Sequence, residues 1–397
     1  MNWKKYFQLD THKNLDYIIV GILGISFISF IMKKPLLFVI VGIFVVYFIF
    51  SELYQRSVGE KLDVENKRTI VRAYPGEDIA LELLISNRSI LPYINGMLEV
   101  SINDVVSTTV HEHAETGERS HIKIPTSIMG KRKTRIHVQL HTEKRGVARI
   151  YQLKYRFPHL INFDFVELTY SPYLHQEIVV FPEMKEVHGI QQLRHDLPGE
   201  QRVRFSPYED IQSMIGTRDY VSTDPFHRIN WNASVKTGEL QTNEFERVID
   251  RSFFILVNLT VTDLRLDVME DFLSYTAFLL QDIHQQGLPY EMVVNARKLG
   301  NTPFIYQKQG EGNAHYIQSL DILARIDRHG ITSRMTQVLM TVRDQLARAH
   351  TIVYIGQLSE NEYGILQNIV GSHKSILHID ENGDLKKLTK EVITRAT

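Results

Sequence analysis

The segment 215–246 carries the densest group of side chains in the chain that could form specific polar contacts. It has few aliphatic residues and follows neither a 3.6-residue nor a two-residue period, so the pattern is typical of neither an amphipathic helix nor an ordinary strand. Two arginines are spaced to form ion pairs with two aspartates, and these residues are Arg218, Arg228, Asp219 and Asp224. The Trp231 indole offers a large apolar surface with a single hydrogen-bond donor. We interpret the segment as an ordered loop that side-chain hydrogen bonds hold together, with Trp231 as its apolar anchor.

Side chains able to perform covalent or metal chemistry are sparse elsewhere. The chain has no cysteine, which excludes disulfides, thiolate zinc sites and cysteine nucleophiles. His111, Glu112 and His113 could coordinate a metal, but no third ligand is apparent, so we interpret them as a solvated loop. We find no nucleophile–base pair, glycine-rich phosphate loop or suitably spaced pair of carboxylates. The sequence therefore predicts a protein that is not an enzyme, with no catalytic or cofactor-binding residues.

The C-terminal residues 248–397 alternate strand and helix patterns and would form one domain. The run 252–258 is continuously apolar, which is typical of a strand buried on both faces. Further strands are expected at 291–295, 350–355 and 376–379, and helices at 267–286, 314–328, 334–349 and 360–370. Repeated βα units predict a mostly parallel sheet with helices on both faces. Ligands of such sheets bind at the carboxyl ends of the strands.

Residues 62–182 follow a two-residue period instead and predict a second domain. Partly alternating runs, separated by turn residues, occur at 79–85, 97–102, 134–140 and 147–151. Short strands at this spacing predict an all-β, immunoglobulin-like sandwich. Such a module usually binds another molecule or acts as a spacer between domains. Residues 183–247 would then form a linker that ends in the polar segment described above.

Two uncharged apolar runs predict a transmembrane hairpin over residues 1–61, with spans at about 16–32 and 35–53. The first run is not a cleaved signal peptide, because a second span follows and no small-x-small site is present. One face of the membrane would receive Lys4, Lys5, Lys13, Arg56 and Lys61, and the other only Lys33 and Lys34. The positive-inside rule therefore predicts a multi-pass protein of the cell membrane whose soluble domains are cytoplasmic. Lysine plus arginine number 45 and aspartate plus glutamate 46, so no bulk charge favours nucleic acid as a partner.

The polar segment resembles the signature of the bacterial family known as domain of unknown function 58. The matching positions are Gly216, Arg218, Tyr220, Asp224, Arg228, Ile229, Trp231, Ala233, Ser234 and Leu240. The resemblance covers the whole plan of the chain. It implies a pair of membrane helices, a β domain, the signature and a C-terminal α/β domain of the von Willebrand A type. The expected fold is therefore a multidomain membrane protein.

The resemblance also implies where a divalent cation would bind. Domains of the von Willebrand A type carry an Asp-x-Ser-x-Ser motif after the first strand, and the matching residues here are Asn258, Thr260 and Thr262. Mg²⁺ favours anionic oxygen ligands, so the neutral Asn258 should weaken binding severely. We expect a degenerate site without a bound cofactor, at most a weak Mg²⁺ site. Thr262 or Asp263 would instead cap the following helix.

The function that these features favour is a membrane-anchored, non-enzymatic adaptor or assembly factor. Proteins that resemble this chain are commonly associated with MoxR-type AAA+ ATPases and with transglutaminase-like membrane proteins, so the resemblance implies such partners. A surface receptor or adhesion protein of the von Willebrand A type is an alternative that uses the same domains. A metal-dependent hydrolase is a third alternative, and it requires the cation site.

Overall fold

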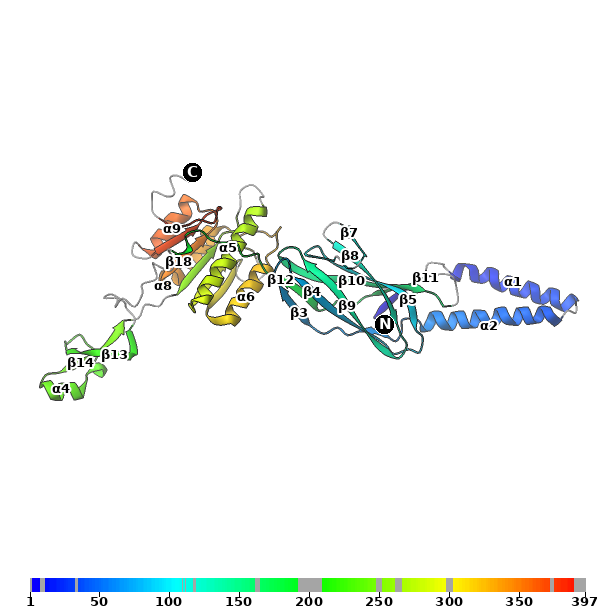
Figure 1. Cartoon of the computed structure of the whole chain (residues 1–397), viewed down its shortest axis with the longest axis horizontal. Helices are drawn as coiled ribbons and strands as arrows, with labels where there is room; N and C mark the ends of the chain where they lie inside the picture. The colour runs from blue at the N-terminus through cyan, green and yellow to red at the C-terminus, as the bar shows by residue number, and fades with distance from the viewer. Residues whose placement is uncertain are drawn as a thin grey trace. The chain divides into compact units, whose positions relative to one another are not determined.

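The computed structural model describes residues 2–7, 11–32, 35–108, 110, 112–116, 119–160, 165–191, 209–247, 252–260, 266–297, 303–371 and 375–388. The chain divides into two compact units, Met1–Glu183 and Met184–Thr397, and each is described by itself (Figure 1). Together they form a mixed α/β protein with several separate sheets.

The first unit begins with a short strand and two helices. The strand is β1 (Trp3–Phe7), and the helices α1 (Thr11–Met32) and α2 (Pro35–Ser57) contact each other along an antiparallel pair (Figure 1). Within the described residues, Val39–Ser57 is the helical stretch that is long and apolar enough to cross a membrane. Its apolar side chains are largely exposed, because no protein core surrounds them. The first predicted span, at about 16–32, falls within α1, and the second, at about 35–53, falls within α2. Lys33 and Lys34 lie outside the described residues, and a double crossing of the membrane stays a prediction.

Two antiparallel-rich sheets follow in the first unit. The strands are β2 (Leu62–Val64), β3 (Thr69–Ala73), β4 (Asp78–Asn87), β5 (Tyr93–Asn103), β6 (Val106–Ser107), β7 (Glu112–Thr116), β8 (Arg119–Ile128), β9 (Arg132–Thr142), β10 (Gly146–Pro158), β11 (Phe165–Tyr170) and β12 (Gln176–Val180). One sheet has the order β1-β11-β10-β5-β8-β7, with β12 and β3 branching from β10, and the other has the order β2-β4-β9-β6.

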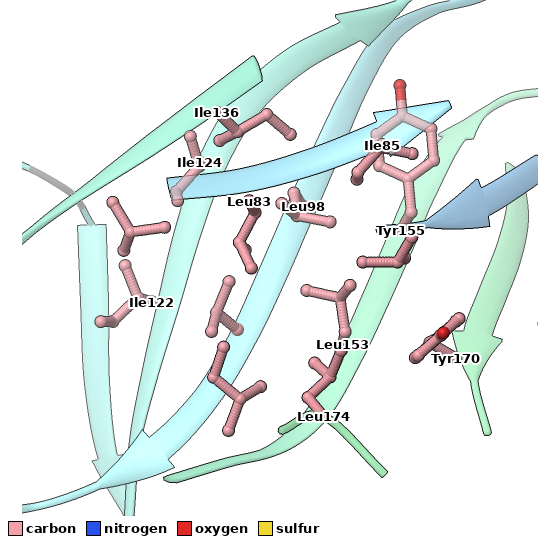
Figure 2. Close-up of a cluster of buried hydrophobic side chains, with 14 of the residues drawn as sticks. Leu83, Ile85, Leu98, Ile122, Ile124, Ile136, Leu153, Tyr155, Tyr170 and Leu174 are labelled. Atoms are coloured by element: carbon pink, nitrogen blue, oxygen red, sulfur yellow. The ribbon is translucent and has the colours of Figure 1, made fainter. Parts of the chain in front are cut away.

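The two sheets enclose one apolar core. Leu83, Ile85 and Ile136 of the smaller sheet meet Leu98, Ile122, Ile124 and Leu153 of the larger one (Figure 2). The alternation of buried and exposed positions along β4 and β9 follows from the two-residue period of a strand with one wet face. This arrangement matches the expected β domain at the level of two packed sheets. The N-terminal β1, which pairs with β11, was not predicted, because it has only five residues and its partner strand is far away in the sequence.

The second unit contains a six-stranded sheet with helices. Its elements are β15 (Phe253–Val257), α5 (Leu266–Gln285), β16 (Tyr290–Val294), β17 (Ile305–Gly310), α6 (Gly312–Ala324), α7 (Met335–Thr341), α8 (Arg343–Arg348), β18 (Thr351–Ile355), α9 (Glu360–Val370), β19 (Ser375–Ile379) and β20 (Leu385–Lys387). The order is β17-β16-β15-β18-β19-β20. The four central strands are parallel, and β17 and β20 are antiparallel edges.

Helices cover both faces of this sheet. On one face, α7, α8 and α9 share a core with alternate strand residues such as Phe254, Leu256 and Tyr354. On the other face, Tyr290 of β16 reaches Ser319 of α6 with a hydroxyl–hydroxyl distance of 2.7 Å, and α6 contacts α5. The chain runs from β15 to β16 on one side and later to β18 on the other. The carboxyl ends of β15 and β18 therefore form the crevice at which sheets of this kind bind ligands.

Two elements of the second unit differ from the sequence prediction. The expected helix 334–349 is divided into α7 and α8, because Val342 between them has φ −97° and ψ 19°. The edge strands β17 and β20 were missed, because edge strands with polar residues lack the continuous apolar run that identifies a central strand.

Candidate functional site

The signature segment forms a small ordered module instead of a loop. We use the name hairpin module for the antiparallel strands β13 (Glu209–Asp219) and β14 (Gln241–Arg247), with the short helices η1 (Phe226–Arg228) and α4 (Trp231–Thr237) in their connection. The prediction of an ordered loop was wrong in that the segment contains two strands and two short helices. The register of β13 and β14 shifts twice, which breaks the two-residue period that would have identified strands in the sequence.

An ion pair predicted from the sequence organises the first half of the module. Both terminal nitrogens of Arg218 donate to the two carboxylate oxygens of Asp224 at 2.7 Å, a two-pronged geometry. Asp224 also accepts from the backbone N–H of Val221 at 3.0 Å. Hydrogen bonds from Arg218 and then from Val221 hold the pKa of Asp224 below its usual value, with Arg228 as a further nearby charge. The pair closes a tight turn, because Asp224 N–H also donates to Val221 O at 2.8 Å.

Amide and hydroxyl groups hold the second half of the module. Asn230 caps α4 by accepting from the N–H of Ala233 at 3.0 Å, and its own amide donates to Asn243 on β14 at 2.7 Å. Ser234 donates to Asn230 O at 2.8 Å and accepts from the N–H of Gln241 at 2.9 Å. These largely part-buried hydrogen bonds fix α4 against β14. Asn230 and Gln241 were not singled out from the sequence, although an Asn before a helix start is a capping signal.

The large apolar side chains of the hairpin module lie at its surface. Trp231 is 60% exposed, Phe226 71% and Val235 84%. Trp231 and Val235 are four residues apart on α4 and so share one face of that helix. The prediction of Trp231 as a buried anchor was therefore wrong, and Ile229, at 5% exposure, is the apolar residue that the module buries. The module keeps a fixed shape while presenting aromatic and aliphatic surface to the outside.

The remaining signature residues support the same frame. Gly216 lies in β13 opposite Glu244, and Tyr220 N–H donates to Leu240 O at 2.9 Å. Tyr220 also donates its hydroxyl to Asp224 O at 3.2 Å, and its ring meets Phe226 edge-on with 6.0 Å between centroids. Leu240 itself is 44% exposed. The hairpin module therefore brings all the described signature positions into one connected structure.

The second candidate site lies at the carboxyl end of β15. Asn258 and Thr260 are brought together there, and Asn295, at the end of β16, joins them. The Asn295 amide donates to Asn258 Oδ1 at 2.7 Å and to Thr260 Oγ1 at 2.9 Å. Asn295 Oδ1 in turn accepts from the N–H of Leu259 at 2.7 Å. Thr262, the third predicted ligand, lies outside the described residues, as does Asp263.

The Asn258 side chain is fully engaged by protein groups. Its amide donates to the Tyr354 hydroxyl and to Gln357 O, both at 2.8 Å, and its Oδ1 also accepts from Thr260 N–H at 3.1 Å. Together with the Asn295 bond, these contacts use both donors and both acceptor sites of the amide. Burial, followed by the nearby carboxylate of Glu362, raises the pKa of Tyr354 well above its usual value, so the phenol stays protonated.

A pocket of about 680 Å³ opens beside this network. Its lining includes Gly356 and Gln357 after β18 and His378 and Asp380 at the end of β19. His378 Nε2 lies 2.8 Å from Gly356 O, and burial lowers the pKa of the imidazole, which therefore donates this bond in its neutral form. No group of three or more His, Cys, Asp or Glu residues able to hold a metal occurs within the described part of the chain. The network around Asn258 is thus built from neutral amides and hydroxyls, whereas the pocket beside it is also lined by three carboxylates, those of Glu362, Asp380 and Glu381.

No family model matches this chain. The uncharacterized protein YeaD from Bacillus subtilis is 23% identical over 269 residues, which are 67% of this chain and 64% of that protein. The chain therefore spans less than two thirds of the length of this relative.

Two solved structures show partial likeness to the chain. A non-cellulosomal cohesin from the archaeon Archaeoglobus fulgidus aligns over 35% of this chain and 99% of its own, with 12% identity and a TM-score of 0.20. Spo0M, a sporulation control protein from Bacillus subtilis, aligns over 30% of this chain and 48% of its own, with 12% identity and a TM-score of 0.16.

Proposed function

We propose that the chain is a membrane-anchored, non-enzymatic adaptor that binds another protein through its hairpin module. The observation that carries this proposal is the exposure of Trp231, Phe226 and Val235 on a module whose backbone is held by the Arg218–Asp224 pair and the Asn230 cap. Aromatic side chains on a preorganised surface are the usual anchors of protein interfaces, because little conformational freedom is lost when they are buried. A solvated connection between domains has no need of such a surface.

The network around Asn258 uses its amide and hydroxyl groups in bonds within the protein, and none of these groups is aligned as a nucleophile with a base. The resemblance of the signature to domain of unknown function 58 supports the same proposal. Under this proposal the N-terminal helices form a two-pass cell-membrane anchor, residues 62–182 an immunoglobulin-like sandwich and residues 248–397 a von Willebrand A-type domain in the cytoplasm.

The proposed partner is an AAA+ ATPase of the MoxR type, acting with a transglutaminase-like membrane protein. The proposed task of the adaptor is to hold that ATPase at the membrane during assembly or maturation of a complex. This partner is inferred from the family resemblance, and the exposed face of α4 is the surface on which we expect it to bind.

Crosslinking in cells, detergent extraction and capture of the tagged full chain test this proposal. We expect the wild-type chain to retain an AAA+ ATPase and the Trp231→Ala variant to lose most of it. Met340→Ala is the matched control, because Met340 is also exposed (58%) in the second unit but lies on α7. Failure to recover an ATPase with any variant, or equal recovery with Trp231→Ala, contradicts the proposal.

The alternative, a surface receptor, predicts that the soluble domains lie on the outer side of the membrane. A reporter that is active only in the cytoplasm, fused after the last residue, should be active if the chain is the proposed adaptor. It should be silent if the chain is a receptor whose soluble domains face outward. Protease added to intact cells gives an independent measurement, because only the receptor would lose its C-terminal half.

A further inference from the structure

Exposed apolar and basic side chains gather at one end of the two-sheet unit, where α2 joins it. We use the name helix-end rim for the loop 88–92, the turn 129–131 and residues 159, 160 and 165. Both helices connect to this end, because β1 directly precedes α1 and β2 directly follows α2. No part of the hairpin module or of the second unit is involved, so this surface is separate from the proposed docking site.

Strand pairing in the larger sheet places part of the rim at this end. Phe7, the last residue of β1, is opposite Val166 of β11, so the start of β11 lies at the end from which α1 departs. Pro158, the last residue of β10, is opposite Phe165. Exposed Leu160 and Phe165 therefore flank the turn between β10 and β11 next to the helices.

Strand pairing in the two sheets places the turn 129–131 and the loop 88–92 at the same end. In the larger sheet, Ile128 at the end of β8 is opposite Tyr93, which places the turn 129–131 beside the start of β5. In the smaller sheet, Asn87 at the end of β4 is opposite both Leu62 of β2 and Arg132 of β9. The loop 88–92 thus begins where the chain has just left α2.

Direct contacts fix α2 against the rim. The Tyr54 ring meets His159 with 4.5 Å between centroids, and the N–H of Gly59 donates to the Tyr93 hydroxyl at 3.0 Å. Lys5 of β1 closes the end of α2 by donating to the carbonyls of Gln55 at 3.1 Å and Arg56 at 2.6 Å. The end of α2 is therefore held firmly at the rim, and the rim follows any membrane in which α2 is inserted.

Two rim loops support each other and expose an apolar pair. Lys131 N–H donates to Ser89 O at 2.8 Å, and Gly130 lies so close to Ile90 that an added Cβ would come within 2.3 Å of Ile90 O. Ile90 is 76% exposed and its neighbour Met129 47% exposed. Side chains of this kind on a supported loop tip are suited to insertion into an apolar layer.

Cations surround this apolar pair. Lys61, Arg88, Lys131 and Arg132 are exposed, and none of them forms an ion pair with a carboxylate of the described residues. Of the nearby carboxylates, Glu52 pairs with Arg56 at 2.9 Å and Glu60 faces Lys5. The rim is therefore apolar at its tips and positively charged at its edge, which complements an anionic lipid surface.

The length of α2 sets the height of the rim above the hydrocarbon layer. Phe50, which is exposed, precedes Tyr54 by four residues, and a helix rises 1.5 Å per residue, so the Tyr54–His159 contact lies about 6 Å beyond Phe50 along the helix. The headgroup layer on each side of a bilayer is of this order, since the total thickness exceeds the hydrocarbon core by about 10–15 Å. The rim is thus level with the headgroups when the apolar part of α2 is inside the bilayer.

We propose that the helix-end rim is a lipid-binding surface, in which Ile90 and Met129 enter the interfacial layer and the surrounding lysines and arginines contact anionic headgroups. The surface would hold the β domain by this end at the membrane and fix its orientation. This inference rests on the membrane anchoring contained in the proposed function, and it is independent of the protein partner.

Single cysteines in the full chain test the proposal cleanly, because the chain has no cysteine of its own. We would label Ile90→Cys and Met129→Cys with an environment-sensitive dye, reconstitute the protein in liposomes and quench with lipids spin-labelled near the headgroup. Ile43→Cys on α2 reports insertion of the anchor, and Val110→Cys, exposed beside Asp78 and His141 at the opposite end of the sheets, reports the aqueous side.

The four labels separate the possible outcomes. Blue-shifted emission and quenching at positions 90 and 129, but not at 110, support lipid binding by the rim. If position 43 is shielded from water while 90 and 129 behave like 110, the anchor stands and the rim proposal is wrong. If position 43 is itself in water, α2 is not inserted, and the rim proposal fails together with the anchoring on which it rests.

A second experiment varies the charge of the lipids and so tests the electrostatic part of the proposal. We expect quenching at position 90 to be stronger in liposomes that contain phosphatidylglycerol than in pure phosphatidylcholine. The double change Lys131→Glu and Arg132→Glu should remove this difference, since each basic residue near an anionic surface strengthens association about fivefold. The pair Lys123→Glu and Lys154→Glu, in the middle of β8 and β10, is the matched charge control and should keep it. Quenching that is equal in both lipids and in both variants would overturn the electrostatic part of the proposal.

Discussion

The amide of Asn295 lies 2.7 Å from Asn258 Oδ1 and 2.9 Å from Thr260 Oγ1, so one amino group joins the two described residues that the sequence placed in a cation site. A cation bound by both oxygens would have to occupy the region that this amino group fills. The partial positive charge of an amide donor satisfies the same two acceptors without any net charge. The neutral Asn258 and Asn295 are therefore parts of one arrangement, which stabilises the strand ends through hydrogen bonds.

The first prediction concerns the stability that this arrangement provides. Asn295→Ala should destabilise the second unit, because it leaves the buried N–H of Leu259 without its acceptor and removes one of the two donors to the buried Asn258 Oδ1. Each buried polar group left without a partner costs about 1–3 kcal/mol. Asn313→Ala, on the exposed side of α6, is the matched control and should change little. Chemical denaturation of both variants measures the difference, and equal midpoints would refute the structural role of Asn295.

The second prediction concerns divalent cations. We expect millimolar Mg²⁺ or Mn²⁺, or their removal with a chelator, to leave the thermal unfolding of the chain unchanged, because Asn258 and Thr260 already have protein partners. A ligand that binds only the folded state must raise its stability. Calorimetric binding that Thr260→Ala abolishes would contradict this expectation and revive the metal-dependent hydrolase.

The third prediction separates the exposed and buried apolar residues of the hairpin module. Trp231→Ala should change the stability of the module by no more than about 0.5 kcal/mol, as is usual for surface positions. Ile229→Ala removes a side chain that is only 5% exposed and should cost on the order of 2–5 kcal/mol. Limited proteolysis within residues 209–247 reports the opening of the module. Faster cleavage of Trp231→Ala than of Ile229→Ala would show that the indole is needed for folding.

The elements that the sequence predicted well are those whose identity depends on local pattern. β15 and β18 are fully buried, so a continuous apolar run sufficed to identify them. The expected helix at 360–370 has the observed bounds of α9, whose start is marked by a capping box between Ser359 and Glu362. The alternation in β4 and β9 likewise reflects one buried and one wet face.

The elements that the sequence could not predict depend on partners far away in the chain. β1 is a strand because it pairs with β11, about 160 residues later. β13 and β14 form through a shifted register that leaves no simple period. The exposure of Trp231 was missed for another reason: residue type shows that an indole is apolar, but it does not show whether protein or a binding partner covers it. Asn295 was overlooked because no local motif joins it to Asn258.

The fourth prediction compares a glycine whose position cannot accommodate a side chain, Gly356, with one whose position can, Gly364. Gly356 has φ +115°, and an added Cβ would lie 2.2 Å from Asn258 O, so Gly356→Ala should disrupt the joint between β15 and β18. The backbone conformation alone should cost on the order of 1–3 kcal/mol. Gly364 lies inside α9 with no atom within 4 Å of an added Cβ, so Gly364→Ala should stabilise the unit by about 0.5–1 kcal/mol. Thermal unfolding of the two variants should therefore shift in opposite directions, and a tolerated alanine at position 356 would contradict the geometry.

The last prediction concerns the acid sensitivity of the second unit. Burial lowers the pKa of His378 and of His315, whereas both imidazoles have an ordinary pKa of about 6.5 in the unfolded chain. Between the lowered and the ordinary pKa the unfolded state binds more protons than the folded state, so stability rises with pH in this window. The stabilisation is fully present above about pH 6.5 and is lost as the pH falls toward the lowered values.

Replacing one imidazole isolates its share of this dependence. His378→Gln can keep a donor to Gly356 O but cannot take up a proton, so we expect a smaller loss of stability between neutral pH and about pH 5. Asp380 and Lys386, the charged groups near His378, remain in place, and the imidazole of His315 should retain its own contribution. Hydrogen exchange of the β18 and β19 amides across this range measures the effect in the unit concerned. His329→Gln, at an exposed position, is the control, and an unchanged pH dependence in His378→Gln would show that its protonation is not linked to folding.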